Sequence, residues 1–382
     1  MFLAAGVAVI AGGLHADVAT ARQKKDLAAG FQEIATKAGI DKHTPGVAVV
    51  SHTPMGIHWV ETFGLADLKD GHPIGTGTVF EIASCSKPFT ATAILILYDM
   101  GKLDIRDPVR KYIPELPPGN KDNPVRIAHL LHHTGGLPNY MAFENVKPKI
   151  KGTLVNEDFI PEFARQKDKF PPLFAPGDRN EYSNTGYIIL ATIIQRVSGQ
   201  TYGEFMRDHI FALLKMTTTF VYENQQAPFK LPIQASKSVA VAYEKQAKKK
   251  TPEWTETWGC PPRRHEELLG VGDGGIWTCL EDMQKWDHAI RERALLKPLT
   301  WAKALTPSKT KDGKTNNYGF GWMLDFDGDK LVGFGHNGGW GGFSSWYWLD
   351  LAKDRTTILL SNKSGFKPEE FRDQMNTLLD KK

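Results

Sequence analysis

The sequence predicts an α+β fold in which both ends of the chain contribute to one mainly antiparallel sheet, flanked by helices, with a helical region inserted between them. Strand-like runs occur early, at residues 46–51 and 57–63, and return after Tyr318. Between about residues 85 and 300 the pattern is largely helical and is broken by loops rich in Pro and Gly. Two groups of strands around a helical middle are most simply joined in a single sheet.

This pattern divides the chain into parts. Residues 17–80 and 315–382 form the sheet region and residues 81–314 the mainly helical region, so together they make one discontinuous unit with a cleft where the regions meet. Residues 1–16 have the length of the apolar part of a signal peptide but lack the positively charged segment that precedes it. We expect a signal or disordered segment there and a periplasmic or secreted location, with a cytoplasmic location as the alternative. No other apolar run approaches the roughly 20 residues of a membrane span.

The first elements are a helix and a hairpin. Residues 17–37 have helical periodicity, with an apolar face formed by Leu27, Phe31 and Ile34. The turn-forming stretch T-P-M-G separates the two early strands, which are therefore expected to pair as a hairpin.

A later helix is expected to start at Thr278, because T-C-L-E matches a capping box with Glu281. Its buried stripe consists of Leu280, Met283, Trp286 and Ile290. The late strands are expected at residues 318–325, 330–336, 344–350 and 355–362, and a final helix at about residues 367–380.

The composition is that of an ordinary soluble globular protein. Of 382 residues, 41% are hydrophobic and 24% are charged, and the formal net charge is +4. The basic run at residues 245–250 lacks interleaved aromatic residues, so we interpret it as a solvated loop and expect no nucleic-acid partner. Cys85, Cys260 and Cys279 are too few for a disulfide framework and lack metal-ligand spacing, although Cys260 and Cys279 could pair.

The stretch E-I-A-S-C-S-K-P-F-T, residues 81–90, contains three potential nucleophiles ahead of one lysine. If a helix begins near Ser84, residues three apart share a face, so Ser84 and Lys87 point the same way while Cys85 and Ser86 point elsewhere. A serine hydroxyl needs a neighbouring base, and a lysine is one only when burial or nearby cations lower its pKa. The geometry therefore selects Ser84, and Cys85 is expected to pack inward.

Two other motifs are better explained by a structural role than by the binding of a metal ion or a dinucleotide. His129, His132 and His133 lack the Glu and the spacing of a metallohydrolase helix. G-V-G-D-G-G, residues 270–275, fits a dinucleotide-binding pattern, but no strand immediately precedes it, so we interpret it as a glycine loop that leads into the next helix. We expect neither a metal ion nor an organic cofactor.

S-x-x-K alone is a weak signal, but in this sequence further motifs accompany it. F-E-I-A-S-C-S-K-P-F-T-A is followed in order by G-K-L-D-I-R-D-P-V-R-K-Y-I-P-E-L, H-L-L-H-H-T-G-G-L-P, P-G-D-R-N-E-Y-S-N-T-G-Y and G-H-N-G-G-W-G-G-F-S-S. From about residue 40 to the end, the sequence resembles the class C branch of the serine β-lactamase and penicillin-binding-protein family, which also contains DD-peptidases, D-aminopeptidases and carboxylesterases. The resemblance implies a β-lactamase/transpeptidase-like fold.

The resemblance also implies roles for individual residues. Ser84 is the nucleophile that accepts the acyl group, and Lys87 and Tyr182 form the proton-transfer pair, with either of them as the base. Tyr182 could instead be an aromatic residue that only lines the cleft. Asn184 is expected to bind the amide or acyl part of the substrate; the alternative is that it caps a turn.

The third motif begins at His336 and is expected on a strand of the sheet. The backbone N–H groups of Ser84 and Gly339 would form the oxyanion hole, and Gly338 and Gly339 would let the strand approach the substrate. β-Lactamases of this branch carry lysine where this chain has His336, whereas some DD-peptidases and D-aminopeptidases carry histidine. Recognition of a substrate carboxylate then becomes conditional on the histidine charge. His336 could instead be a structural donor to Tyr182.

We therefore expect a serine hydrolase that forms a Ser84 acyl-enzyme with a small-molecule or short-peptide amide or ester: DD-peptidase-like, D-aminopeptidase-like or carboxylesterase, with weak β-lactamase activity. The alternatives are a penicillin-type sensor that acylates and stalls, an acyltransferase using the same residues, and a metal-dependent hydrolase. The oligomeric state is left open.

Overall fold

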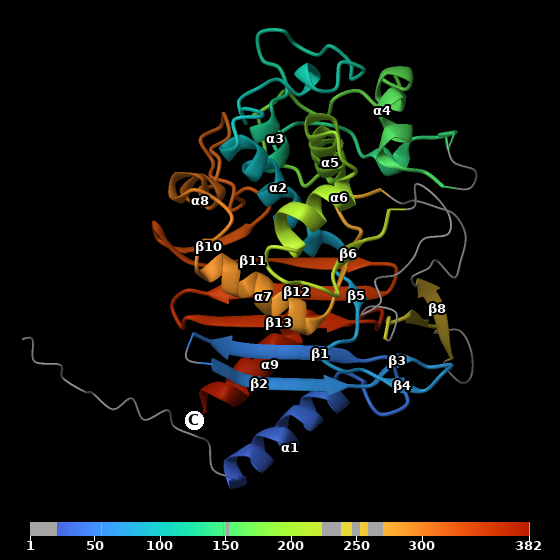
Figure 1. Cartoon of the computed structure of the whole chain (residues 1–382), viewed down its shortest axis with the longest axis vertical. Helices are drawn as coiled ribbons and strands as arrows, with labels where there is room; N and C mark the ends of the chain where they lie inside the picture. The colour runs from blue at the N-terminus through green and yellow to red at the C-terminus, as the bar shows by residue number, and fades with distance from the viewer. Residues whose placement is uncertain are drawn as a thin grey trace, which may run out of the picture.

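The computed structural model describes residues 21–54, 56–147, 149, 153–223, 238–246, 253–258 and 270–381. Its centre is a six-stranded antiparallel sheet of order β10-β11-β12-β13-β1-β2. The strands are β1 (Val47–Thr53), β2 (Gly56–Phe63), β10 (Met323–Asp327), β11 (Lys330–Trp340), β12 (Phe343–Asp350) and β13 (Arg355–Ser361). Both ends of the chain thus contribute to one sheet, and the predicted α+β fold is confirmed (Figure 1).

Several predictions concern residues that the structure does not describe. Residues 1–16, Cys260 and most of the basic run at 245–250 lie outside the described residues. Cys85 and Cys279 are free and buried. The predicted hairpin is formed by β1 and β2, with Val47 opposite Phe63.

The sheet is covered on both faces, so its strands direct apolar side chains to both sides. On one face it packs against α1 (Ala21–Lys37) and α9 (Pro368–Asp380), and Val49 of β1 belongs to this core. Val50, its neighbour, points to the opposite face and joins the larger core shared with the helical region. The apolar face predicted for the first helix lies in the smaller core: Leu27, Phe31 and Ile34.

The middle of the chain folds into the helical region around α2 (Lys87–Asp99), which contacts α5 (Asn184–Ser198) and α6 (Tyr202–Met206). Residues 87–97 of α2 are all buried, as the apolar run predicts. The other helices and helical turns are η1 (Ala83–Ser86), η2 (Val109–Lys111), α3 (Ile127–Leu131), η3 (Tyr140–Ala142), α4 (Asn156–Arg165), α5 (Asn184–Ser198), α6 (Tyr202–Met206), η4 (Arg207–Phe211), α7 (Leu280–Arg291) and α8 (Pro298–Ala304).

Short strands also occur before and within this region, where the sequence predicts mainly helices. They are β3 (Leu65–Asp67), β4 (His72–Pro73), β5 (Phe80–Glu81), β6 (Phe220–Val221), β7 (Ala242–Lys245), β8 (Trp254–Trp258) and β9 (Ile276–Thr278). The three-stranded sheet β5-β9-β6 matters most for the site, because β5 leads directly into η1.

The capping box predicted at Thr278 is wrong. Thr278 ends β9 and its hydroxyl is hydrogen-bonded to Thr219 Oγ1 at 2.6 Å, so Cys279 occupies the N-cap of α7 without a side-chain bond. Glu281 instead accepts a hydrogen bond from the Thr76 hydroxyl. The predicted stripe of α7 is nonetheless buried: Leu280, Met283, Trp286 and Ile290.

The strand predicted at residues 318–325 begins later, at Met323. The preceding residues bend over the start of α2, where Gly321 has φ +78°. A Cβ at this glycine would lie 2.8 Å from the carbonyl oxygen of Lys87, so only glycine permits the close approach.

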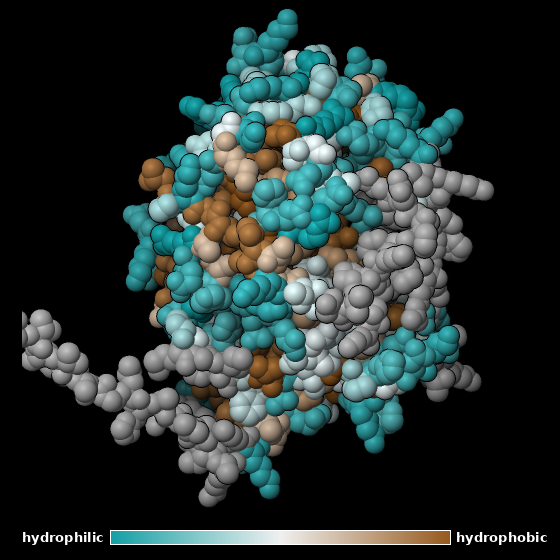
Figure 2. Space-filling model, in the orientation of Figure 1, coloured by the Kyte–Doolittle hydropathy of each residue, from teal (hydrophilic) through white to brown (hydrophobic). Residues whose placement is uncertain are grey.

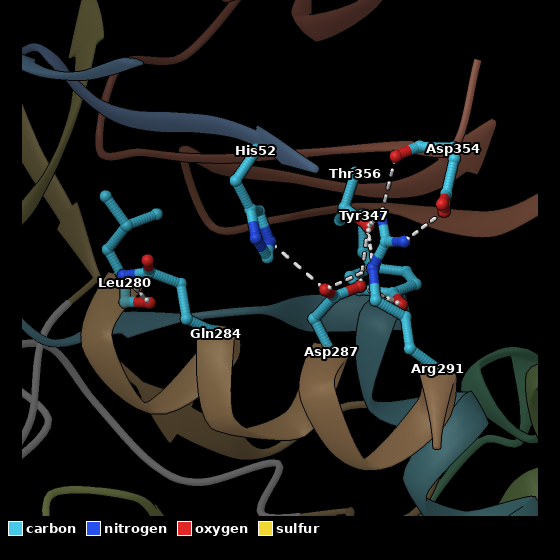
Figure 3. Close-up of polar contacts among 8 residues, drawn as sticks. All are labelled: His52, Leu280, Gln284, Asp287, Arg291, Tyr347, Asp354 and Thr356. Carbon is cyan, nitrogen blue, oxygen red and sulfur yellow. Dashed lines mark hydrogen bonds and ion pairs between the residues drawn. The ribbon is translucent and has the colours of Figure 1, made fainter. Parts of the chain in front are cut away.

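A buried acidic residue, Asp287, joins α7 to the sheet (Figure 3). Its carboxylate accepts hydrogen bonds from Tyr347 Oη and Thr356 Oγ1, both at 2.7 Å, and from Arg291 Nε at 2.9 Å. His52 Nε2 lies 3.1 Å from the same carboxylate. These contacts tie one helix to β1, β12 and β13.

On the face shown in Figure 2, hydrophobic residues gather near the middle, between the positions of α8 and α6 in Figure 1, while the periphery is mainly hydrophilic. Leu299 on α8 is the most exposed large hydrophobic side chain of the described residues, at 79%. Within the described part of the chain, no helix is both long and apolar enough to cross a membrane.

Candidate active site

Ser84 lies on the turn η1, between β5 and the buried helix α2. The turn opens with Ala83 at φ +45°, a left-handed conformation that a residue with a side chain rarely adopts. A 3₁₀ turn places residues i and i+3 on the same side, so Ser84 and Lys87 face each other. The Lys87 Nζ donates to the Ser84 Oγ at 2.9 Å. Cys85 points away, and its thiol donates to the His336 carbonyl.

Lys87 is fully buried and is held by three acceptors. Besides Ser84 Oγ, its Nζ donates to Asn184 Oδ1 and to the backbone oxygen of Asp273, both at 2.9 Å. Burial lowers the pKa of Lys87 to about 8, and the opposing charge of Asp273 limits the shift. At pH 7 a minor fraction of the molecules, about a tenth, therefore carries the neutral amine that a lysine base requires, and this fraction grows as the pH rises toward 8.

Tyr182 lies beside this pair, with its ring centroid 4.9 Å from Lys87 Nζ. The residue is 48% exposed overall, yet burial around its hydroxyl raises the pKa, and an interaction with Ser84 only partly offsets the rise. The phenol therefore stays protonated near neutral pH, which suits it to pass a proton between Ser84 and its surroundings rather than to exist as a stable phenolate.

Asn184 is the first residue of α5, and Ser183 is the N-cap, whose hydroxyl accepts a hydrogen bond from Gly186 N. The capping role that was the alternative for Asn184 is therefore filled by its neighbour. Asn184 directs its side-chain oxygen to Lys87 and lines the pocket in front of Ser84.

The H-L-L-H-H segment supports the loop that carries Tyr182. His133 adopts φ +58°, its Nδ1 accepts a hydrogen bond from Ser183 N at 3.1 Å, and its carbonyl accepts one from Glu181 N at 2.9 Å. Its ring centroid lies 4.3 Å from that of Tyr182. His129 and His132 also make backbone hydrogen bonds. Within the described residues, no three His, Cys, Asp or Glu side chains are grouped as metal ligands.

His336 lies on β11 as predicted, but it is only 1% exposed. Its Nε2 is hydrogen-bonded to the Tyr318 hydroxyl at 2.9 Å, so its side-chain partner is Tyr318 and not Tyr182. Burial, aided by the charge of Lys87, lowers the pKa of His336 to about 3. The imidazole is therefore neutral at ordinary pH and offers no cation to a substrate carboxylate.

Gly338 brings β11 against the nucleophile turn. A Cβ at Gly338 would lie 2.4 Å from the Ile82 carbonyl oxygen and 2.9 Å from Ser84 N, whereas Gly339 has open space and lines the pocket. The two glycines therefore let the strand lie beside the backbone of Ser84, where the oxyanion hole is predicted.

Replacement of Gly338 by alanine is expected to push β11 away from Ser84 and to lower kcat/KM by about 100-fold, the scale of a lost oxyanion-hole donor. Steady-state hydrolysis of a p-nitrophenyl ester measures the loss, with the melting temperature recorded alongside. Gly75→Ala is the matched control, because the nearest atom to its Cβ is 4.0 Å away. A folded Gly338→Ala protein with wild-type kcat/KM would contradict this geometry.

The Beta-lactamase family model matches residues 23–381, nearly the whole described chain. The chain belongs to the Beta-lactamase family.

Relatives within this family have several names. Penicillin-binding protein 4* of Bacillus subtilis (strain 168) is 31% identical over 329 residues, which are 85% of this chain and 69% of that protein. Two further curated relatives are matched over 58% and 63% of their length. Among solved structures, the penicillin binding protein from Bacillus halodurans has a TM-score of 0.73 at 24% identity, covering 91% of this chain and 98% of that one.

A second solved structure, D-amino acid amidase from Ochrobactrum anthropi SV3 complexed with D-phenylalanine, has a TM-score of 0.70 at 22% identity, covering 93% of this chain and 99% of that one. At these identities the two structures establish a shared fold. Both predictions, the family resemblance and the β-lactamase/transpeptidase-like fold, are confirmed.

The Beta-lactamase-family pocket also contains residues that sequence reasoning missed. About 590 Å³ of space, open to solvent, lies in front of Ser84. Glu81 and Asp273 line it together with Asn184 and Gly339. Glu81 precedes Ser84 by three residues, and Asp273 lies in the glycine loop at 270–275. The sequence signal for a role of these residues in the pocket was therefore only that each of the two motifs contains a carboxylate.

Proposed function

We propose that this protein is a serine hydrolase that forms an acyl-enzyme at Ser84 and acts on amide or ester substrates. The contact between Lys87 Nζ and Ser84 Oγ, at 2.9 Å, carries the proposal. It joins a nucleophile that lines a pocket to a buried amine whose pKa is lowered.

In the first half-reaction the Ser84 oxygen bonds to the substrate carbonyl carbon and its proton passes to Lys87, directly or through Tyr182. The N–H groups of Ser84 and Gly339 stabilise the negative charge on the carbonyl oxygen. The bond to the amine or alcohol then breaks, and the leaving group takes up the proton. In the second half-reaction, water adds to the acyl carbon with the same proton transfers and releases the acid and Ser84.

The neutral, buried His336 supports peptide-type amides and carboxylic esters over penicillins, which bring a carboxylate into the site. A relative of the same fold is a D-amino acid amidase, which agrees with this ranking. We therefore propose D-amino-acid amides, short peptides and esters as substrates, with weak β-lactamase activity.

The test is intact mass spectrometry after exposure to a fluorophosphonate, a penicillin and short acyl esters. Wild-type protein and Cys85→Ala are expected to gain one adduct, and Ser84→Ala none, because burial raises the pKa of the Cys85 thiol to about 12 and leaves it unreactive. Labelling that persists in Ser84→Ala and disappears in Cys85→Ala would overturn the assignment. An ester adduct that never clears would identify an acylating sensor instead of a hydrolase.

A further inference from the structure

The pocket beside Ser84 has an acidic wall formed by Glu81 and Asp273. The Glu81 side chain is 5% exposed, and its Oε1 accepts a hydrogen bond from Gly275 N at 3.3 Å. Its second oxygen, Oε2, is buried without a hydrogen-bond partner, although the residue lines the pocket. A buried carboxylate oxygen without a donor is costly, so this atom points to a missing group that donates hydrogen bonds.

Asp273 places a second carboxylate in the same pocket. Its Oδ2 accepts a hydrogen bond from Tyr140 Oη at 3.2 Å, while its backbone oxygen holds Lys87. Burial raises the pKa of both acids, that of Glu81 to about 8, and the neighbouring charge of Asp273 adds to the rise at Glu81. The charge of Lys87 acts to lower the pKa of Asp273, so that carboxylate has a cation nearby, whereas no positive charge acts on the pKa of Glu81.

The described residues that line this pocket include no Lys, Arg or His. Lys87, a cation among the described residues beside the pocket, already donates to three acceptors. Apolar surface borders the acids: Met141 and Trp340 line the pocket and are 41% and 39% exposed. The pocket thus offers two acidic groups and apolar contact, and its described lining has no cation that would hold an anion. Glu81 is mostly protonated in the empty pocket at pH 7, and a bound ammonium group would favour its ionised form.

We propose that Glu81 and Asp273 form a subsite for a positively charged amine of the substrate. The ammonium group donates to Glu81 Oε2 and to the Asp273 carboxylate, while the scissile carbonyl lies at Ser84 and the apolar part of the substrate rests on Met141 and Trp340. This inference rests on the proposed function and names its substrate class: amides, peptides or esters that carry a free amine near the scissile bond.

The test compares alanine p-nitroanilide, which has a free amine, with N-acetyl-alanine p-nitroanilide, each as D and L forms. In the wild-type protein we expect kcat/KM to be at least tenfold higher for the free-amine compound of the preferred hand. The ratio of the two values is expected to fall about tenfold or more in Glu81→Gln and in Asp273→Asn, mainly through KM. Glu369→Gln, an exposed residue of α9, is the matched control with an unchanged ratio.

A wild-type ratio near one, or a ratio unchanged in both folded variants, overturns the amine subsite while turnover itself upholds the hydrolase. If no compound is turned over and Ser84 is not labelled, the proposed function fails separately. Saturation-transfer NMR of Ser84→Ala with benzylamine and benzyl alcohol then still decides the subsite. Binding of the amine alone, lost in Asp273→Asn, supports it, and equal or absent binding of both overturns it.

Discussion

Replacing Lys87 by methionine is expected to lower kcat/KM for ester hydrolysis by about 10³-fold, within the range of general acid–base catalysis. Methionine keeps an unbranched apolar stem in the buried helix but removes the amine that contacts Ser84 Oγ. Asn184 Oδ1 and the Asp273 carbonyl also lose their donor. Steady-state kinetics on a p-nitrophenyl ester measure the effect.

The matched control is Lys111→Met, which removes an exposed ammonium group that is paired with Asp107 and does not line the pocket in front of Ser84. It should hydrolyse the ester at the wild-type rate. Circular dichroism distinguishes a lost base from a lost fold. A folded Lys87→Met protein within tenfold of wild-type activity would exclude Lys87 as the base and leave Tyr182 as the candidate.

The pH profile gives an independent test of Lys87. Because burial lowers its pKa to about 8, and only the unprotonated amine can accept the Ser84 proton, kcat/KM is expected to rise with pH and level off above about 8. An ordinary exposed lysine would give this rise near pH 10.4.

Replacing Asp287 by asparagine is expected to lower the free energy of unfolding by about 3 to 5 kcal/mol, the usual cost of breaking a buried ion pair. The carboxylate is fully buried and contacts Arg291, His52, Tyr347 and Thr356 (Figure 3). An amide cannot accept from all of these donors, so several remain buried without a partner. Urea denaturation measures the change.

Asp354→Asn is the matched control, because the Asp354 side chain is 62% exposed and pairs with the same arginine. Its effect should stay within about 1 kcal/mol, as for other surface pairs. Equal losses in the two variants would show that the buried contacts to the sheet do not account for the effect of Asp287.

The stabilisation by Asp287 should also depend on pH. Burial acts to raise the pKa of this carboxyl, but hydrogen bonds from His52, Thr356 and Tyr347 outweigh it, so the folded-state pKa is lowered. The contribution is therefore complete above the unfolded value of about 3.9 and is lost as the pH falls through the folded-state pKa.

The sequence was sufficient for features that depend on neighbours along the chain. The three-residue spacing of Ser84 and Lys87 predicted their contact, and it survives although Ser84 lies on a 3₁₀ turn and not in an α-helix. Alternating and helical patterns predicted β1, β2, the stripe of α7 and the position of α9 within a few residues.

The features that the sequence did not predict depend on packing between distant segments of the chain. Thr278 has a good capping sequence, but its hydroxyl bonds to Thr219, 59 residues away. The environment of His336 is set by Tyr318 and by burial, which its own motif does not reveal. Asp273 and Glu81 line one pocket only because β5 and β9 pair, which joins residues nearly two hundred positions apart.

The pairing of β1 with β13 has a consequence for synthesis of the protein on the ribosome. Val47 is aligned with Ser361, so an interior seam of the sheet joins its first strand in the sequence, β1, to its last, β13. Until β13 is synthesised, β1 and β12 each have one edge without a strand to pair with. Because this pairing joins segments so far apart in the sequence, we expect the sheet to close late in folding, with those edges open to association with other chains until then.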